Sequence, residues 1–122
     1  MANDFKRLAK ADIGTGTGAS ADAVYSVPAG TSSTALESIV IGINIVNKNA
    51  AERTVGIFLD NYDGSNDVYI TKELVIPPKT TVEIMSGNKL VVQNNGTTGD
   101  VIRAEASATS SIDVTISVLE DV

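Results

Sequence analysis

The strongest constraint on the fold is a strict two-residue alternation of side chains near the C-terminal end of the chain. From Ile112 to Val118, isoleucine and valine alternate with aspartate, threonine and serine. Side chains two apart project to the same side of an extended chain, so this segment is predicted to be a strand with one buried face and one wet face. Valine and isoleucine together outnumber leucine 26 to 6, which suits pleated sheet and is poor for helix.

Other segments repeat this alternation between turn signals. Four isoleucines fall on alternate positions, and we expect one strand to bury them as a continuous row: Ile39, Ile41, Ile43 and Ile45. Pro77-Pro78 cannot donate to a strand ladder and Asn95-Gly96 tolerates positive φ, so both mark strand ends. The expected strands are 23–27, 38–45, 55–59, 68–76, 81–84, 89–93, 102–108 and 112–118.

About eight short strands separated by turns, with no helical pattern after residue 20, indicate an all-β fold. The expected architecture is a single antiparallel β-sandwich, or jelly-roll-like domain, formed by residues 21–122. A chain of 122 residues is long enough for one such domain to bury a core without disulfides.

Residues 1–20 differ in kind from the rest. Apolar and basic side chains are interspersed in the first ten residues, a pattern compatible with a short helical turn: Phe5, Lys6, Arg7, Leu8 and Lys10. A glycine-rich run at 14–18 follows, and it is too flexible to pack alone. We interpret residues 1–20 as a flexible N-terminal arm and hinge whose apolar and basic residues bind a partner. A frayed terminus is the alternative.

Charge and hydropathy exclude several classes of partner. The net charge is −6, and residues 21–122 carry 13 acidic but only 6 basic side chains. Such an acidic body repels phosphate, so no nucleic-acid binding is expected. No apolar run approaches the length of a membrane span, and no apolar segment follows the basic start as in a signal peptide. We expect a protein made in a cytoplasm that does not bind membranes.

The residue types present argue against catalysis. The chain has no cysteine, histidine or tryptophan, which removes thiol and imidazole nucleophiles and the usual zinc ligands. The glycine run at 14–18 lacks the preceding strand and following helix that a dinucleotide loop requires. Most acids alternate with apolar residues along strands, as solvated residues do. We therefore expect neither an enzyme nor a cofactor.

One loop gathers oxygen ligands. Residues 60–67 hold three carboxylates, Asp60, Asp63 and Asp67, together with two asparagines. Calcium takes six to eight oxygens, but the spacing does not match an EF-hand, there is no closing glutamate, and Asp-Gly is an ordinary turn. We expect no metal site, and these three aspartates are the candidates if the loop does bind calcium.

The order of motifs resembles that of small β-sandwich virion proteins of tailed bacteriophages, especially marine and cyanobacterial phages. The likeness covers residues 23–120. It rests on the long isoleucine strand ending at Asn44-Ile45-Val46-Asn47 and on five further segments: Val24–Thr31, Val55–Asp60, Leu74–Thr81, Gly99–Ile102 and Ile112–Glu120.

This resemblance implies a structural role in the virion and no catalytic residues. The main expectation is a capsid decoration, or cement, protein that binds the major capsid protein or other virion proteins and stabilises the head shell. The arm would then anchor in a groove of the shell, and the copies would form a homo-oligomer, with a trimer plausible. A tail, neck or fibre component is the first alternative. A calcium- or carbohydrate-binding module that uses the loop at 60–67 is the second.

Overall fold

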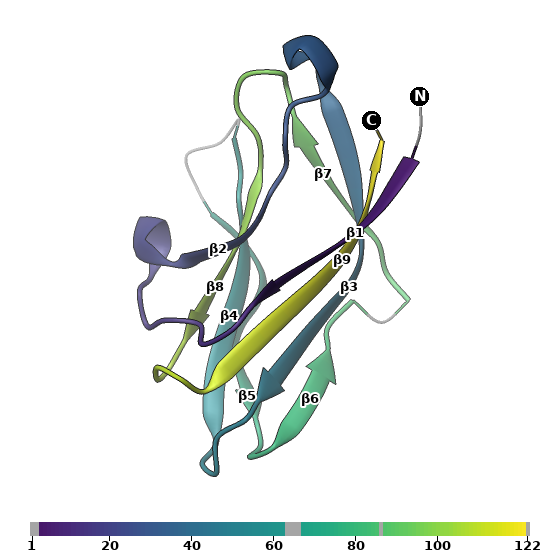
Figure 1. Ribbon diagram of the computed structural model, residues 1–122. Coiled ribbons are helices and arrows are strands. Elements are labelled where there is room, and N and C mark those ends of the chain that lie inside the picture. Colours follow the sequence, from purple (N-terminus) through teal and green to yellow (C-terminus); the bar gives the residue numbers. More distant parts are fainter. Residues whose placement is uncertain (1–2, 63–66, 86, 122) are drawn as a thin grey trace.

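The computed structural model describes residues 3–62, 67–85 and 87–121, which form nine strands in two antiparallel sheets (Figure 1). The first sheet has the order β1-β9-β3, and β6 and β7 both pair with the far edge of β3. Its strands are β1 (Asn3–Lys10), β3 (Leu36–Asn47), β6 (Thr80–Glu83), β7 (Leu90–Asn94) and β9 (Ile112–Asp121). The second sheet has the order β2-β8-β4-β5, with β2 (Asp22–Ser26), β4 (Arg53–Asp60), β5 (Val68–Ile76) and β8 (Val101–Ala106). The prediction of an all-β antiparallel sandwich is confirmed.

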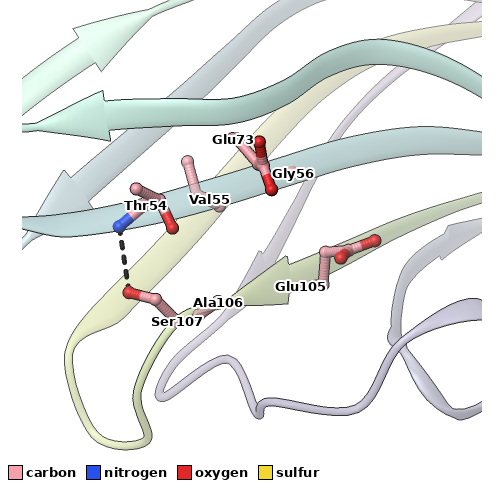
Figure 2. A pocket seen from close by; sticks show the side chains of 7 residues that line it. All are labelled: Thr54, Val55, Gly56, Glu73, Glu105, Ala106 and Ser107. Atoms are coloured by element: carbon pink, nitrogen blue, oxygen red, sulfur yellow. Dashed lines mark hydrogen bonds between the residues drawn. The ribbon is translucent and has the colours of Figure 1, made fainter.

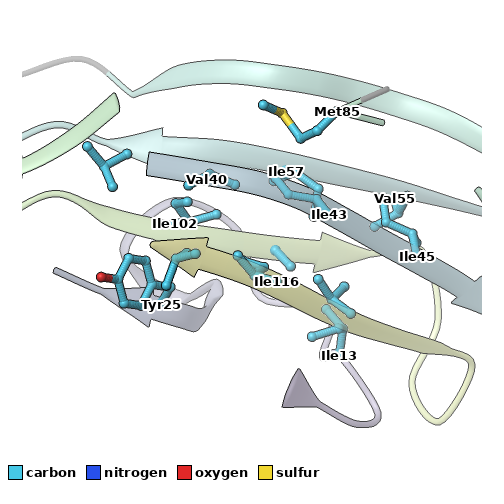
Figure 3. Close-up of a cluster of buried hydrophobic side chains, with 14 of the residues drawn as sticks. Ile13, Tyr25, Val40, Ile43, Ile45, Val55, Ile57, Met85, Ile102 and Ile116 are labelled. Carbon is cyan, nitrogen blue, oxygen red and sulfur yellow. The ribbon is translucent and has the colours of Figure 1, made fainter. Parts of the chain in front are cut away.

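The core lies between the two sheets and consists mainly of β-branched side chains (Figure 3). β9 alternates as its sequence predicts: its even-numbered residues from Ile112 to Val118 are fully buried. Ile57 and Ile102 face them from β4 and β8. Burying a side chain of this size contributes about 1.5–3 kcal/mol, so the isoleucine and valine content of the chain is the main source of its stability.

The isoleucine strand departs from the prediction of one continuous buried row, which is wrong. The register of β3 against β9 shifts between Val40 and Gly42, where a β-bulge inserts one extra residue. Val40 is buried before the bulge and Ile43 is buried after it. Because an extra residue reverses which alternate positions face the core, Ile39 and Ile41 lie on the outer side of the sheet.

Glycine at this bulge leaves room for the close approach of a neighbouring side chain. A Cβ at Gly42 would lie 3.1 Å from Oε1 of Glu83. The other oxygen of that carboxylate, Oε2, accepts the backbone N–H groups of Ile43 and Met85, each at 2.8 Å. Glu83 therefore satisfies the backbone where β6 ends and the ladder of β3 is interrupted.

The N-terminal residues also differ from expectation. The helical turn predicted for the first ten residues is wrong, because residues 3–10 form β1, which pairs with β9 along its whole length (Figure 1). Ile13 is fully buried, and its N–H donates to the Ile112 carbonyl. The carbonyl of Gly14 accepts the N–H of Ala106 in the second sheet. Residues expected to form a separate arm thus supply an edge strand, a core side chain and a crossing between the sheets. The basic side chains of β1 suit an edge, where charge opposes pairing with foreign strands.

Because of the bulge, replacing Ile41 and replacing Ile43 by alanine should lower the free energy of unfolding by different amounts. Ile43→Ala removes a fully buried side chain and should lower the free energy of unfolding by about 2–5 kcal/mol. Ile41 is 41% exposed, so Ile41→Ala should cost less than about 1 kcal/mol. Urea denaturation of both variants measures the difference. Equal losses would mean that both side chains lie in the core, as the uninterrupted alternation predicted.

Candidate interaction surface

The outer face of the first sheet carries a straight row of apolar side chains across four strands. Phe5 on β1 is paired with Leu119 on β9, Leu119 with Ile39 on β3, and Ile39 with Val91 on β7. The buried neighbours of these residues in β9, β3 and β7 face the core, so alternation turns the row outward. We call these four residues the apolar row. At a strand spacing of about 4.8 Å, it is about 14 Å long.

The two ends of the apolar row are its most exposed parts. Phe5 is 74% exposed and Val91 55%, while Ile39 and Leu119 are partly covered by their neighbours. Ile41, which the bulge turns outward, adds apolar area next to Ile39. A large aromatic side chain with most of its surface in water is costly to leave uncovered, so the row has the character of a contact surface.

Side chains of opposite charge flank the apolar row. On one side lie Glu37 and the uncharged Gln93, which are paired with each other across β3 and β7; because Glu37 carries the charge, we call this the acidic flank. On the other side lie Arg7 on β1 and Lys89, which is exposed and directly precedes β7, and we call this the basic flank. Glu83 lies near the basic flank, where its carboxylate accepts two backbone N–H groups, and with Arg7 and Lys89 the formal charge of this side is +1. The face therefore has a negative side and a positive side.

Beneath this surface, a buried carboxylate holds β1 to the sandwich. Glu120 of β9 is 1% exposed, and its Oε2 accepts the Tyr25 hydroxyl of β2 at 2.6 Å. Ser38 Oγ lies 2.8 Å from the same hydroxyl. Oε1 of Glu120 lies 2.9 Å from Nζ of Lys6 and has no other partner among the described residues. The carboxylate thus links an edge strand, a central strand and the opposite sheet.

The electrostatics of this network follow from burial and pairing. Burial, with the hydrogen bond to Glu120, raises the pKa of Tyr25 above its ordinary value of 10.0. The hydrogen bond and the charge of the same carboxylate raise the pKa of Lys6. A buried carboxylate without a cation is strongly destabilising, so Lys6 ties the N-terminal strand to its place. That in turn positions Phe5 and Arg7 on the outer face.

The five residues predicted to bind a partner are not brought together. Alternation along β1 places Phe5 and Arg7 on the outer face, whereas Lys6 points inward to Glu120. Leu8 is half-buried against the core, and Lys10 is exposed at the end of β1. Only Phe5 and Arg7 therefore belong to the surface described here. Ile39, Val91 and Leu119 were not predicted, because strand pairing brings them together across the sheet and they have no common spacing in the chain.

The aspartate loop lies partly outside the described residues. Asp63 is not among them, while Asp60 Oδ2 accepts the Nε–H of Arg103 at 2.9 Å and Asp67 is exposed. The carboxylate of Asp60 therefore already has a cationic partner. Within residues 3–62, 67–85 and 87–121, no group of three or more acidic side chains is arranged to hold a metal ion. Calcium binding by this loop stays an untested alternative.

A shallow hollow on the second sheet is a further feature of the surface (Figure 2). Its volume is about 120 Å³, and β4, β5 and β8 contribute its walls, including Gly56, Glu73 and Glu105. The Glu105 carboxylate accepts the Tyr69 hydroxyl at 2.8 Å. Side chains from three strands therefore line a hollow that can hold water molecules.

Neither the known protein-family models nor the curated proteins include a match to this chain. In the part of the chain that the structure describes, no helix is long and apolar enough to cross a membrane.

The buried network predicts that the loss of unfolding free energy caused by Tyr25→Phe depends on pH. At pH 7 the variant should lose about 1–3 kcal/mol of unfolding free energy, because Glu120 keeps its burial but loses a donor. A raised pKa in the folded state means that the unfolded chain releases the tyrosine proton first. The wild-type chain therefore loses this contribution as the pH rises above 10, and the gap between the two proteins should narrow.

Urea denaturation at pH 7 and between pH 10 and 11 measures this gap. Tyr69→Phe is the matched control, because Tyr69 is exposed on the second sheet and its loss should change the unfolding free energy much less at pH 7. A gap that stays constant with pH would contradict the described burial of the Tyr25 hydroxyl.

Proposed function

We propose that the chain is a non-enzymatic structural protein of a tailed-phage particle, and that it acts as a decoration, or cement, protein that binds and stabilises the head shell. The single observation that carries the proposal is the apolar row with its charged flanks. The resemblance of residues 23–120 to small β-sandwich virion proteins is the reason for proposing a phage particle as the assembly to which the chain belongs. The copies are made in the host cytoplasm and end in the virion.

The chemistry of the outer face suits a protein partner. Protein interfaces combine an apolar centre with a polar, charged rim, and the apolar row lies between Glu37 on one side and Arg7 and Lys89 on the other. The row stands on paired strands, so little conformational freedom is lost when it is covered. A ligand pocket, by contrast, is concave and encloses its ligand, and this face has the shape of an open sheet.

Symmetry, size and charge also bear on a decoration role. Such a protein must bind at many equivalent points of a lattice, and small subunits achieve this as symmetric assemblies of identical copies. A small folded domain of 12.6 kDa with a net charge of −6 stays soluble until it meets its site and does not compete for the packaged nucleic acid. The partners of the face are therefore proteins of the particle, copies of this chain among them.

The copy number on the particle tests the proposal. Particles produced by the phage that encodes the chain are purified, and the chain is quantified by mass spectrometry against the major shell protein. A decoration protein should be present in hundreds of copies per particle, because it covers a repeating lattice.

A ring or a handful of copies would support the tail, neck or fibre alternative over the head. Absence of the chain from purified particles, while it is abundant in the infected cell, would contradict a structural role in the virion.

A further inference from the structure

We infer that the apolar row binds a second copy of this chain, face to face, about a two-fold axis that runs parallel to the row. The inference rests on the proposed function in one respect: among the particle proteins proposed above as partners of this face, it names a second copy of the chain as the one that covers the row. In a closed dimer with a two-fold axis, both copies use the same surface patch. Each contact between one residue of the first copy and another residue of the second is therefore repeated with the copies exchanged.

Because the row is straight, two orientations of the two-fold axis can place the row of one copy on the row of the other. An axis parallel to the row sets every row residue against its own copy, so that Phe5 meets Phe5 and Val91 meets Val91. An axis parallel to the strands sets Phe5 of one copy against Val91 of the other. Both arrangements place apolar side chains on apolar side chains from end to end, so the row alone does not choose between them.

The charges that flank the row distinguish the two orientations of the axis. With the axis parallel to the strands, the acidic flank of one copy faces the acidic flank of the other, and Arg7 faces Lys89. Like charges brought together across an interface oppose association. With the axis parallel to the row, the acidic flank of each copy faces the basic flank of the other. The charge pattern therefore favours the second arrangement.

One ion pair between the copies follows from the register. Glu37 lies two residues before Ile39 on β3, so the axis through the row places it opposite position 41 of the second copy's β3. Leu90 on β7 is paired with Val40 on β3, so Lys89, the residue before Leu90, lies next to that position, about 4.8 Å to the side and about 10 Å across the stacked sheets. Two long side chains bridge this separation. Glu37 of each copy thus pairs with Lys89 of the other, and the dimer contains this pair twice.

The size of the face indicates the strength of the contact. Four strands at about 4.8 Å and eight residues at about 3.3 Å give on the order of 500 Å² per copy. A standard stable interface buries about 800 Å² per partner, so we expect a reversible dimer with a dissociation constant on the order of micromolar. Copies held side by side on a shell experience a far higher effective concentration, at which such a contact is occupied.

Sedimentation equilibrium of the purified chain over a range of concentrations at low salt tests the inference. The wild-type chain should pass from monomer to dimer. Glu37→Lys and Lys89→Glu should each weaken the dimer up to about fivefold, because an exposed pair is replaced by like charges. The double variant E37K/K89E should recover the wild-type dissociation constant within about twofold, since the pair is restored with reversed signs.

A second pair of variants tests the row itself. Val91→Asp should weaken the dimer at least about tenfold, because it places a charge in the apolar contact. Val75→Asp is the matched control: Val75 is 49% exposed but lies on β5 of the second sheet, and its change should leave the dimer intact.

Three results would overturn the inference: a monomer at every concentration, a trimer, or a double charge variant that is weaker than either single variant. These results are distinct from failure of the proposed function. A chain that dimerises but is missing from particles would contradict the virion role alone, and a chain abundant on particles but monomeric would contradict the two-fold contact alone.

Discussion

The β-bulge between Val40 and Gly42 decides which side chains this sandwich buries and which it displays. A strand that alternates without interruption would send all four isoleucines of β3 into the core and would turn Leu36 and Val40 outward. The extra residue reverses the alternation, so Val40 and Ile43 are both buried while Ile39 lies outside. The glycine at the bulge admits the Glu83 carboxylate, which satisfies the interrupted backbone. An apolar outer face is thus a consequence of local backbone geometry.

A second constraint is the buried carboxylate on the inner side of the first sheet. The Glu120 carboxylate is buried and is neutralised by Lys6 of β1, while Tyr25 of the other sheet donates to it. Removing either partner leaves a buried charge poorly compensated, so the N-terminal strand is held against β9 by more than its backbone ladder. Phe5 neighbours Lys6 on β1 and points the other way. The inner face of β1 therefore secures the strand, and its outer face extends the contact surface.

The fold class was predictable from the sequence because alternation and turn residues are local signals, as the segment from Ile112 to Val118 illustrates. The exposed isoleucines were not singled out, because three apolar residues follow one another from Ile39 to Ile41, and this run does not itself show which of them the bulge turns outward. β1 was missed for a related reason: a short charged edge strand has little apolar periodicity, and its partner lies more than 100 residues away. The candidate surface is joined by cross-strand register alone, so only Phe5 and Arg7 could be singled out in advance, as members of a basic and apolar segment.

The orientation of the face-to-face contact is measured most directly by cross-linking single-cysteine variants, which is a clean experiment because the chain has no cysteine of its own. Stacked sheets lie about 10 Å apart, so a short bis-maleimide linker is better suited than a disulfide. Phe5→Cys alone and Val91→Cys alone should each give a covalent dimer, with Val75→Cys on the opposite sheet as the unlinked control. Cross-links that form only when the Phe5→Cys and Val91→Cys proteins are mixed would contradict the axis parallel to the row, and no cross-link above the control would contradict the contact itself.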